Sequence, residues 1–178
     1  MAVGRSDAGE RSGASDPDDP DDPDARLARA GAELAALVTA AVPAWVVRCV
    51  DRALPAATPD RPSVMARAGD AGHRAAGDVG ARLRALLGAD VDAQHTTPLA
   101  VVRAAVSYPT EVLAAAGVEP AVRDAFARER FPADLYGLAP ASLAGLDPAL
   151  AEPALVWGAA KALAHKRRHR GAGPRSAP

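Results

Sequence analysis

Apolar residues recur every three to four positions along most of this 178-residue chain, and that spacing places them on one face of an α-helix. Ala75, Val79 and Leu83 are one example. No stretch shows the alternating β-branched pattern of a strand, and no hairpin turn separates two apolar stretches. The pattern therefore predicts an all-α protein, folded as an irregular, orthogonal-type bundle of about six helices.

Prolines divide the first part of this pattern. We expect a helix that begins at Asp24 and is interrupted at Pro43, because proline removes a helical hydrogen bond and its ring clashes with the preceding turn. A second short apolar stripe then follows over 45–54, before a connector that contains Pro55, Pro59 and Pro62.

The third helix is expected over 63–87 and contains an unusual set of small residues. Gly72, Ala76 and Gly80 stand at four-residue intervals, so they share one helix face. They predict either a groove where another helix approaches closely or, because glycine weakens a helix, a break between Gly69 and Gly80.

The remaining helices have clear start signals. Thr97 and Asp147 each precede a proline, and a capping side chain followed by proline favours a helix start. In a helix over 120–130 we expect Val122 and Phe126 to face inward. In the last helix, which ends near residue 168, the residues expected to be buried are Leu155, Val156, Ala159, Ala160 and Leu163.

The predicted core is thin, because 46 of the 178 residues are alanine. An alanine buries far less apolar area than a leucine does, so burial per residue is modest. A partner protein or a second copy of the chain is a natural way to complete such a core.

Opposite charges gather at the two ends of the chain. Residues 1–24 hold eight acidic and two basic side chains, whereas 161–178 hold six basic side chains and no acidic one. Charge repulsion and repeated prolines predict a disordered acidic arm over 1–24, a single helical domain over 25–168 and a disordered basic tail over 169–178. Because their charges are opposite, the arm is able to fold back over the basic end and compete with any polyanion.

The basic end supplies the candidate polyanion-binding residues. Clustered cations neutralise phosphates on nucleic acid or lipid headgroups, but they also complement the dipole at a helix C-terminus without any ligand. An acidic segment of this chain or of a partner protein is a further alternative. The candidates are Lys161, Lys166, Arg167, Arg168 and Arg170.

Two smaller features have the residue types of a site. His165 and His169 have the four-residue spacing of a metal-binding pair, but no carboxylate on their helix completes a site, so we assign no metal ligand and no cofactor. Trp45, Arg48 and Arg52 form a candidate protein-interaction patch, for which an ordinary ion pair between Arg48 and Asp51 beside a core tryptophan is the alternative.

Cysteine content, the first residues and the length of the apolar stretches predict the cellular location of the chain. A lone Cys49 fits a reducing compartment, and the first residues show no secretory signal. The longest uncharged stretch, 34–47, has 14 residues and contains Pro43, whereas a membrane span needs about 20 residues. We therefore expect a cytoplasmic protein without a transmembrane segment.

Three functional hypotheses follow from these observations. The first is a non-enzymatic helical interaction or accessory protein, which acts through a protein–protein surface on another protein or on a second copy. The second is a nucleic-acid-associated protein that binds phosphates through the basic end. The third is an enzyme whose residues meet only in the fold, because none of the recognisable catalytic motifs is present in the sequence.

Overall fold

The computed structural model describes residues 22–170, and its regular elements in that range are all helices. The predicted all-α class and irregular bundle are thereby confirmed. Residues 1–21 and 171–178, which include most of the predicted arm and tail, lie outside the described residues. The helices are α1 (Pro23–Ala53), α2 (Arg61–Leu87), α3 (Pro98–Ala104), α4 (Ser107–Ala115), α5 (Ala125–Arg130), α6 (Leu143–Leu146) and α7 (Ala151–Arg170), with 3₁₀ turns η1 (Val91–Ala93) and η2 (Pro148–Leu150).

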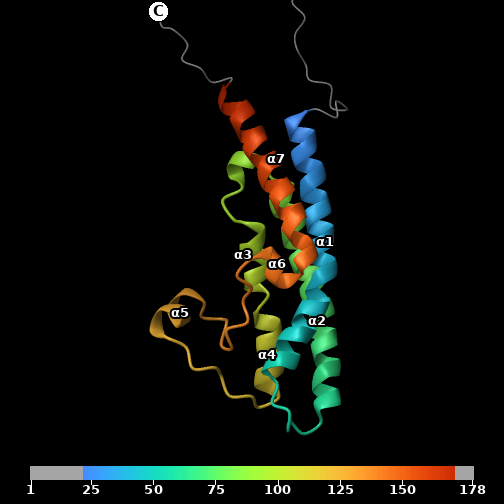
Figure 1. The fold of residues 1–178 in the computed structure, drawn as a ribbon, viewed down its shortest axis with the longest axis vertical. Helices are drawn as coiled ribbons and strands as arrows, with labels where there is room; N and C mark the ends of the chain where they lie inside the picture. The colour runs from blue at the N-terminus through green and yellow to red at the C-terminus, as the bar shows by residue number, and fades with distance from the viewer. Residues whose placement is uncertain (1–21, 171–178) are drawn as a thin grey trace, which may run out of the picture.

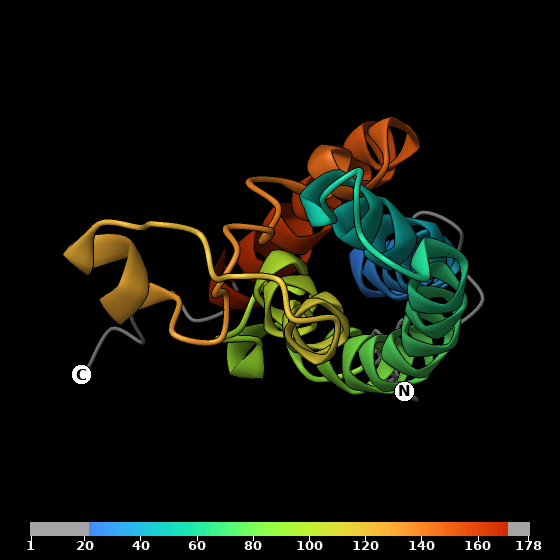
Figure 2. The same cartoon turned by 90° about the horizontal axis from the view of Figure 1, so that it is seen from below.

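Three long helices set the shape of the bundle. α1 and α2 form an antiparallel pair along the long axis, and α7 runs back beside α1 towards the end of the bundle where α1 begins (Figure 1). The shorter α3 and α4 cover α2 and the lower part of α1. Helix α5 stands away from the bundle, on the long segment that joins α4 to α6 (Figure 2).

Helix α1 continues through Pro43, so the predicted interruption is wrong. Proline inside a helix removes one hydrogen bond and its ring clashes with the preceding turn, at a combined cost of about 3 kcal/mol. Here the residues on both sides of Pro43 are anchored in the core, since Val42 and Val46 are fully buried. Packing along the whole helix therefore outweighs the local penalty, and the stripe over 45–54 belongs to the same helix.

The small residues of α2 form the predicted groove, and the alternative of a broken helix is wrong. A Cβ atom on Gly72 would lie 2.9 Å from both the Cα and the carbonyl oxygen of Pro43. A Cβ on Gly80 would lie 2.8 Å from the hydroxyl of Thr39. The backbone of α1 therefore lies against α2 where glycine leaves room for it.

The core is made of small and medium-sized side chains, as the alanine content implies. Leu34, Val38, Val79 and Leu83 are among the fully buried residues between α1 and α2. Trp45 is the one aromatic side chain that is buried among the described residues.

The predicted helix over 120–130 is shorter than expected and does not bury its apolar residues. Only Ala125–Arg130 is helical. Val122 is fully exposed and Phe126 is two-thirds exposed. The reason lies in the preceding residues, where Arg123 donates hydrogen bonds to the carbonyl oxygens of Phe131 and Asp134 and so holds the chain in a loop.

Helix α7 is present as predicted but turns a different face to the bundle. The buried residues of α7 are Ala160 and Ala164. Of the five residues that the sequence predicted to be buried, only Ala160 is. Leu155, Val156 and Leu163 are exposed. The small alanines allow α7 to lie close to α1, and the larger apolar side chains are left on its outer side.

The helical region extends two residues beyond 25–168 at each end. Asp22 caps α1, because its side chain accepts a hydrogen bond of 3.1 Å from the backbone N–H of Ala25. At the other end, His169 and Arg170 belong to α7 rather than to a tail.

Helix α1 has the length and the apolar composition of a membrane-spanning helix. In the bundle it is the helix on which α2, α4 and α7 pack, and 44% of its apolar window is buried inside the protein. The core helix of a soluble protein passes the same test, so the location of the chain stays a prediction.

Candidate functional site

The N-terminus of α1, the turn η1 and the C-terminal end of α7 meet at one end of the bundle, where ion pairs join them. Arg167 on α7 pairs with Asp22. Arg168 pairs with Asp24 at 3.2 Å and also with Asp90, beside η1. The last acidic residues of the predicted arm are therefore bound to the basic end of the chain.

These contacts shift the pKa of two of the residues involved. The pKa of the Asp90 carboxyl is lowered, first by a hydrogen bond from the backbone N–H of Asp92 and then by Arg168. The pKa of Arg168 is raised, chiefly by its bond to Asp90. Both groups are strongly held in their ionised forms.

The five candidate polyanion-binding residues do not form one surface. Arg167 and Arg168 are paired as described, and Lys161 donates a 3.1 Å hydrogen bond to the carbonyl oxygen of Gln94. Its ammonium also lies 5.3 Å from the centre of the Trp157 ring. The other two candidates, Lys166 and Arg170, are exposed on the opposite side of α7 from Lys161.

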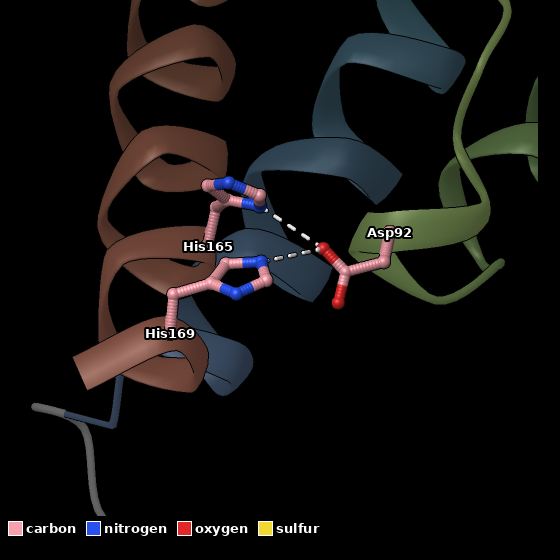
Figure 3. A group of neighbouring side chains, drawn as sticks. All are labelled: Asp92, His165 and His169. Atoms are coloured by element: carbon pink, nitrogen blue, oxygen red, sulfur yellow. Dashed lines mark hydrogen bonds and ion pairs between the residues drawn. The ribbon is translucent and has the colours of Figure 1, made fainter. Parts of the chain in front are cut away.

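The two histidines of α7 meet a carboxylate that the sequence did not associate with them (Figure 3). Nδ1 of His165 lies 3.0 Å from Oδ1 of Asp92, and Nε2 of His169 lies 3.5 Å from the same oxygen. The two rings are 4.2 Å apart between centres. The ligand atoms of the three side chains all lie within 4.8 Å of one another, and all three residues are exposed.

The outward side of α7 is a second candidate surface, which we call the outer α7 face. It consists of Glu152, Leu155, Ala159, Leu163 and Lys166, all exposed. At 100° per residue these side chains project within an arc of about 80°. Leu155 is 74% exposed and Leu163 is 49% exposed, so this arc is an apolar strip with a carboxylate at one end and an ammonium at the other.

A shallow groove of about 440 Å³ borders the outer α7 face, between α7 and α1. Val156 and Leu163 form its α7 wall, and Arg26, Arg29 and Glu33 stand on its α1 wall. The apolar strip is therefore edged by charged side chains on the α1 side.

The predicted interaction residues Trp45, Arg48 and Arg52 come together, but around a cavity rather than on an open patch. All three line a cavity of about 460 Å³ under the 136–141 segment. Trp45 is 3% exposed, and Arg48 donates a hydrogen bond to the carbonyl oxygen of Leu146. The indole belongs to the core, and the arginine secures the segment that covers it.

The alternative ion pair proposed for this region does not form. The carboxylate of Asp51 pairs with Arg61 at 2.6 Å, across the turn between α1 and α2. In the same cavity, burial raises the pKa of the Cys49 thiol from 9.0 to about 11, although Arg52 and Arg48 oppose the shift. A thiol in that state is a poor nucleophile, because the thiolate is the reactive form.

Sequence reasoning missed two parts of these surfaces. Asp92 lies 73 residues before His165, and no local pattern connects them. The outer α7 face was misread because the larger apolar side chains were assumed to be the buried ones. Their spacing did contain a signal, the symmetric order of charge and leucine along the helix.

No family model matches this chain, and no curated protein or solved structure matches it either.

Proposed function

We propose that this chain is a helical interaction protein and that the outer α7 face is its interaction surface, which pairs with a second copy. The exposed leucines of that face carry the proposal. Large apolar side chains gathered on one exposed helix face are typical of protein–protein contacts, whereas scattered ones are not. Leu155 and Leu163 are two turns apart on one strip and have no cover within the described residues.

The order of residues on the strip favours a second copy as the partner. Leu155 and Leu163 each lie four residues from Ala159, and Glu152 and Lys166 each lie seven residues from it. When two such helices pair antiparallel about a two-fold axis at Ala159, each Leu155 meets the other copy's Leu163. Each Glu152 likewise meets the other copy's Lys166, so the face is complementary to itself.

The centre of the strip allows close contact between two copies. Ala159 at the centre and Ala162 beside the strip are small and exposed, so two α7 helices are able to approach closely there. Burial of the two leucines from each copy contributes about 1 kcal/mol or more per side chain. The exposed ion pairs add little energy, about 0.2–1 kcal/mol each, but they fix the antiparallel direction.

The second hypothesis, phosphate binding by the basic end, receives less support from the geometry. Arg167 and Arg168 are already paired with carboxylates, so binding a phosphate requires breaking those contacts. Nucleic-acid binding remains the alternative function, and a cytoplasmic location remains a prediction.

Charge reversal on the outer α7 face tests the proposed pairing. We expect sedimentation equilibrium to show a reversible dimer for the native chain. Glu152→Lys alone and Lys166→Glu alone should each weaken it about tenfold, because each places like charges opposite one another twice per dimer. The double variant should recover the native affinity, and an equimolar mixture of the two single variants should form a heterodimer.

Phe126→Ser is the matched control, because Phe126 is a two-thirds exposed apolar residue on α5, the helix that stands away from the bundle (Figure 2). It should leave the dimer unchanged, whereas Leu155→Ser should dissociate it. A native chain that stays monomeric over the accessible concentration range would exclude self-association. A dimer whose affinity is unchanged by all the α7 substitutions would place the interface elsewhere.

A further inference from the structure

We propose that Asp92, His165 and His169 form a binding site for a divalent transition-metal ion, with Zn²⁺ as the ion that fits best. The site is independent of the proposed α7 pairing, since neither histidine belongs to the outer α7 face. It joins the turn after α2 to the last two turns of α7 (Figure 3).

The positions of the ligand atoms suit a tetrahedral ion. Zinc binds histidine nitrogen and carboxylate oxygen at about 2.0–2.1 Å, which places neighbouring ligand atoms of a tetrahedron about 3.3 Å apart. The two nitrogen–oxygen distances in this cluster, 3.0 and 3.5 Å, lie on either side of that value. Because all three ligand atoms lie within 4.8 Å of one another on exposed side chains, rotation of those side chains can bring them onto one ion.

The chemistry of the three groups favours the same class of ion. Two imidazoles and one carboxylate are a borderline donor set that selects Zn²⁺ and its first-row neighbours over Mg²⁺ or Ca²⁺, which prefer oxygen alone. The three residues are about half exposed, so water is free to complete the coordination. Such an open site exchanges its ion more readily than a closed structural site.

Nearby positive charge is largely neutralised. Arg168, on the flank of the histidine pair, is held by Asp24 and Asp90. Asp90 also brings a second carboxylate to the same turn as Asp92. The exposed cations Lys166 and Arg170 remain on the other flank and will reduce the affinity, in line with an exchangeable site.

Metal binding at this site links two elements that are distant in sequence. The ion would hold η1 against α7, in addition to the ion pairs that already join this end of the bundle. Because the folded chain binds the ion with three groups, the metal should stabilise the folded state.

The test uses the full chain without a histidine tag, at neutral pH. Zn²⁺ is titrated by calorimetry, and Co²⁺ is titrated by visible absorption, whose intense bands report tetrahedral coordination by protein ligands. We expect one saturable site per chain. At a Zn²⁺ concentration about a hundredfold above Kd, the Tm should rise by about 5 °C or more.

Three single variants and one control decide the result. His165→Ala, His169→Ala and Asp92→Asn should each lower the affinity for Zn²⁺ by at least about tenfold, a loss of the size that even outer-shell substitutions cause. All three positions are exposed, so circular dichroism should show an unchanged fold. His73→Ala removes an exposed histidine on α2 and should bind like the native chain.

Two results would overturn the proposal. One is the absence of saturable binding, which would show that the cluster is held by hydrogen bonds alone. The other is binding that persists unchanged in the three ligand variants, which would place the ion elsewhere, for example on the acidic residues before Asp22.

Discussion

Glycines in α2 have different roles that depend only on what lies opposite them. Gly72 faces the backbone of Pro43, whereas a Cβ on Gly69 would meet nothing within 4 Å. The same residue type in one helix is therefore required at one position and merely tolerated three residues earlier.

Alanine substitutions at these two positions should change stability in opposite directions. Gly72→Ala should lower the free energy of unfolding by about 1–3 kcal/mol, because backbone atoms at 2.9 Å have to move. Gly69→Ala should raise it by about 0.5–1 kcal/mol, because alanine restricts the unfolded chain and favours the helix. Urea denaturation measures both. If Gly72→Ala also stabilises the protein, α1 and α2 do not approach as closely as described.

Residue patterns within one helix indicated which of its faces packs closely, but they did not identify partners that are distant in the sequence. The four-residue spacing of Gly72, Ala76 and Gly80 predicted close helix packing as one of two alternatives, and the structure decides against the other, a broken helix. The pairing of Asp92 with two histidines of α7 was not predictable, because it depends on how the chain returns after 73 residues. A metal site assembled from distant elements leaves only half of its pattern, here the histidine spacing, in the sequence.

At the scale of elements, the segment between α4 and α6 depends on one buried carboxylate. Asp134 is 2% exposed and accepts hydrogen bonds of 2.6 and 3.0 Å from the backbone N–H groups of Leu138 and Ala139. The guanidinium of Arg123 lies 3.9 Å from the same carboxylate. Few apolar side chains of this segment are buried, so these polar contacts determine its conformation.

Asp134→Ala should therefore release this segment. Two backbone donors lose their acceptor and Arg123 loses the nearby carboxylate, at a cost of about 2–4 kcal/mol. Hydrogen exchange should accelerate over 118–142, while the amides of α1 and α2 keep most of their protection. Asp51→Ala is the control: it breaks an exposed pair with Arg61 and should cost less than about 1 kcal/mol without affecting 118–142. Equal exchange in both variants would mean that Asp134 does not hold the segment.

Helix existence was predictable from the sequence, but helix ends and buried faces were less so. Thr97 caps the start of α3 as predicted, because capping is a local property. Asp147, the predicted start of the last helix, instead caps the 3₁₀ turn η2, and α7 begins after that turn at Ala151. Pro43 did not end α1, since core packing on both sides outweighs a local break. On α7, periodicity identified a helix but could not tell which neighbour it meets, so the leucines were assigned to the wrong side.

At the scale of the whole molecule, ion pairs join the beginning and the end of the helical region at one end of the bundle. Asp22 and Asp24 begin α1, and Arg167 and Arg168 lie in the last turn of α7. The sequence predicted that acidic and basic ends attract, and the described part of the arm makes such contacts. The same contacts use cations that a phosphate ligand would need.

Removal of these two carboxylates should therefore reveal any latent affinity for polyanions. Asp22→Asn with Asp24→Asn keeps a capping side chain at position 22, but it removes the carboxylate that pairs with Arg167 and one of the two carboxylates that pair with Arg168. We expect the double variant to bind a DNA duplex more tightly than the native chain at low salt. The slope of log K against log salt should steepen by about 1–2, because each added phosphate contact contributes about 0.9.

Lys166→Ala with Arg170→Ala in the native background is the control. It should weaken DNA binding by much less than the two Asp→Asn substitutions strengthen it, since those cations lie on another side of α7. If the double variant binds no better than the native chain, the pairs at this end serve the fold alone and the phosphate-binding hypothesis loses its remaining basis.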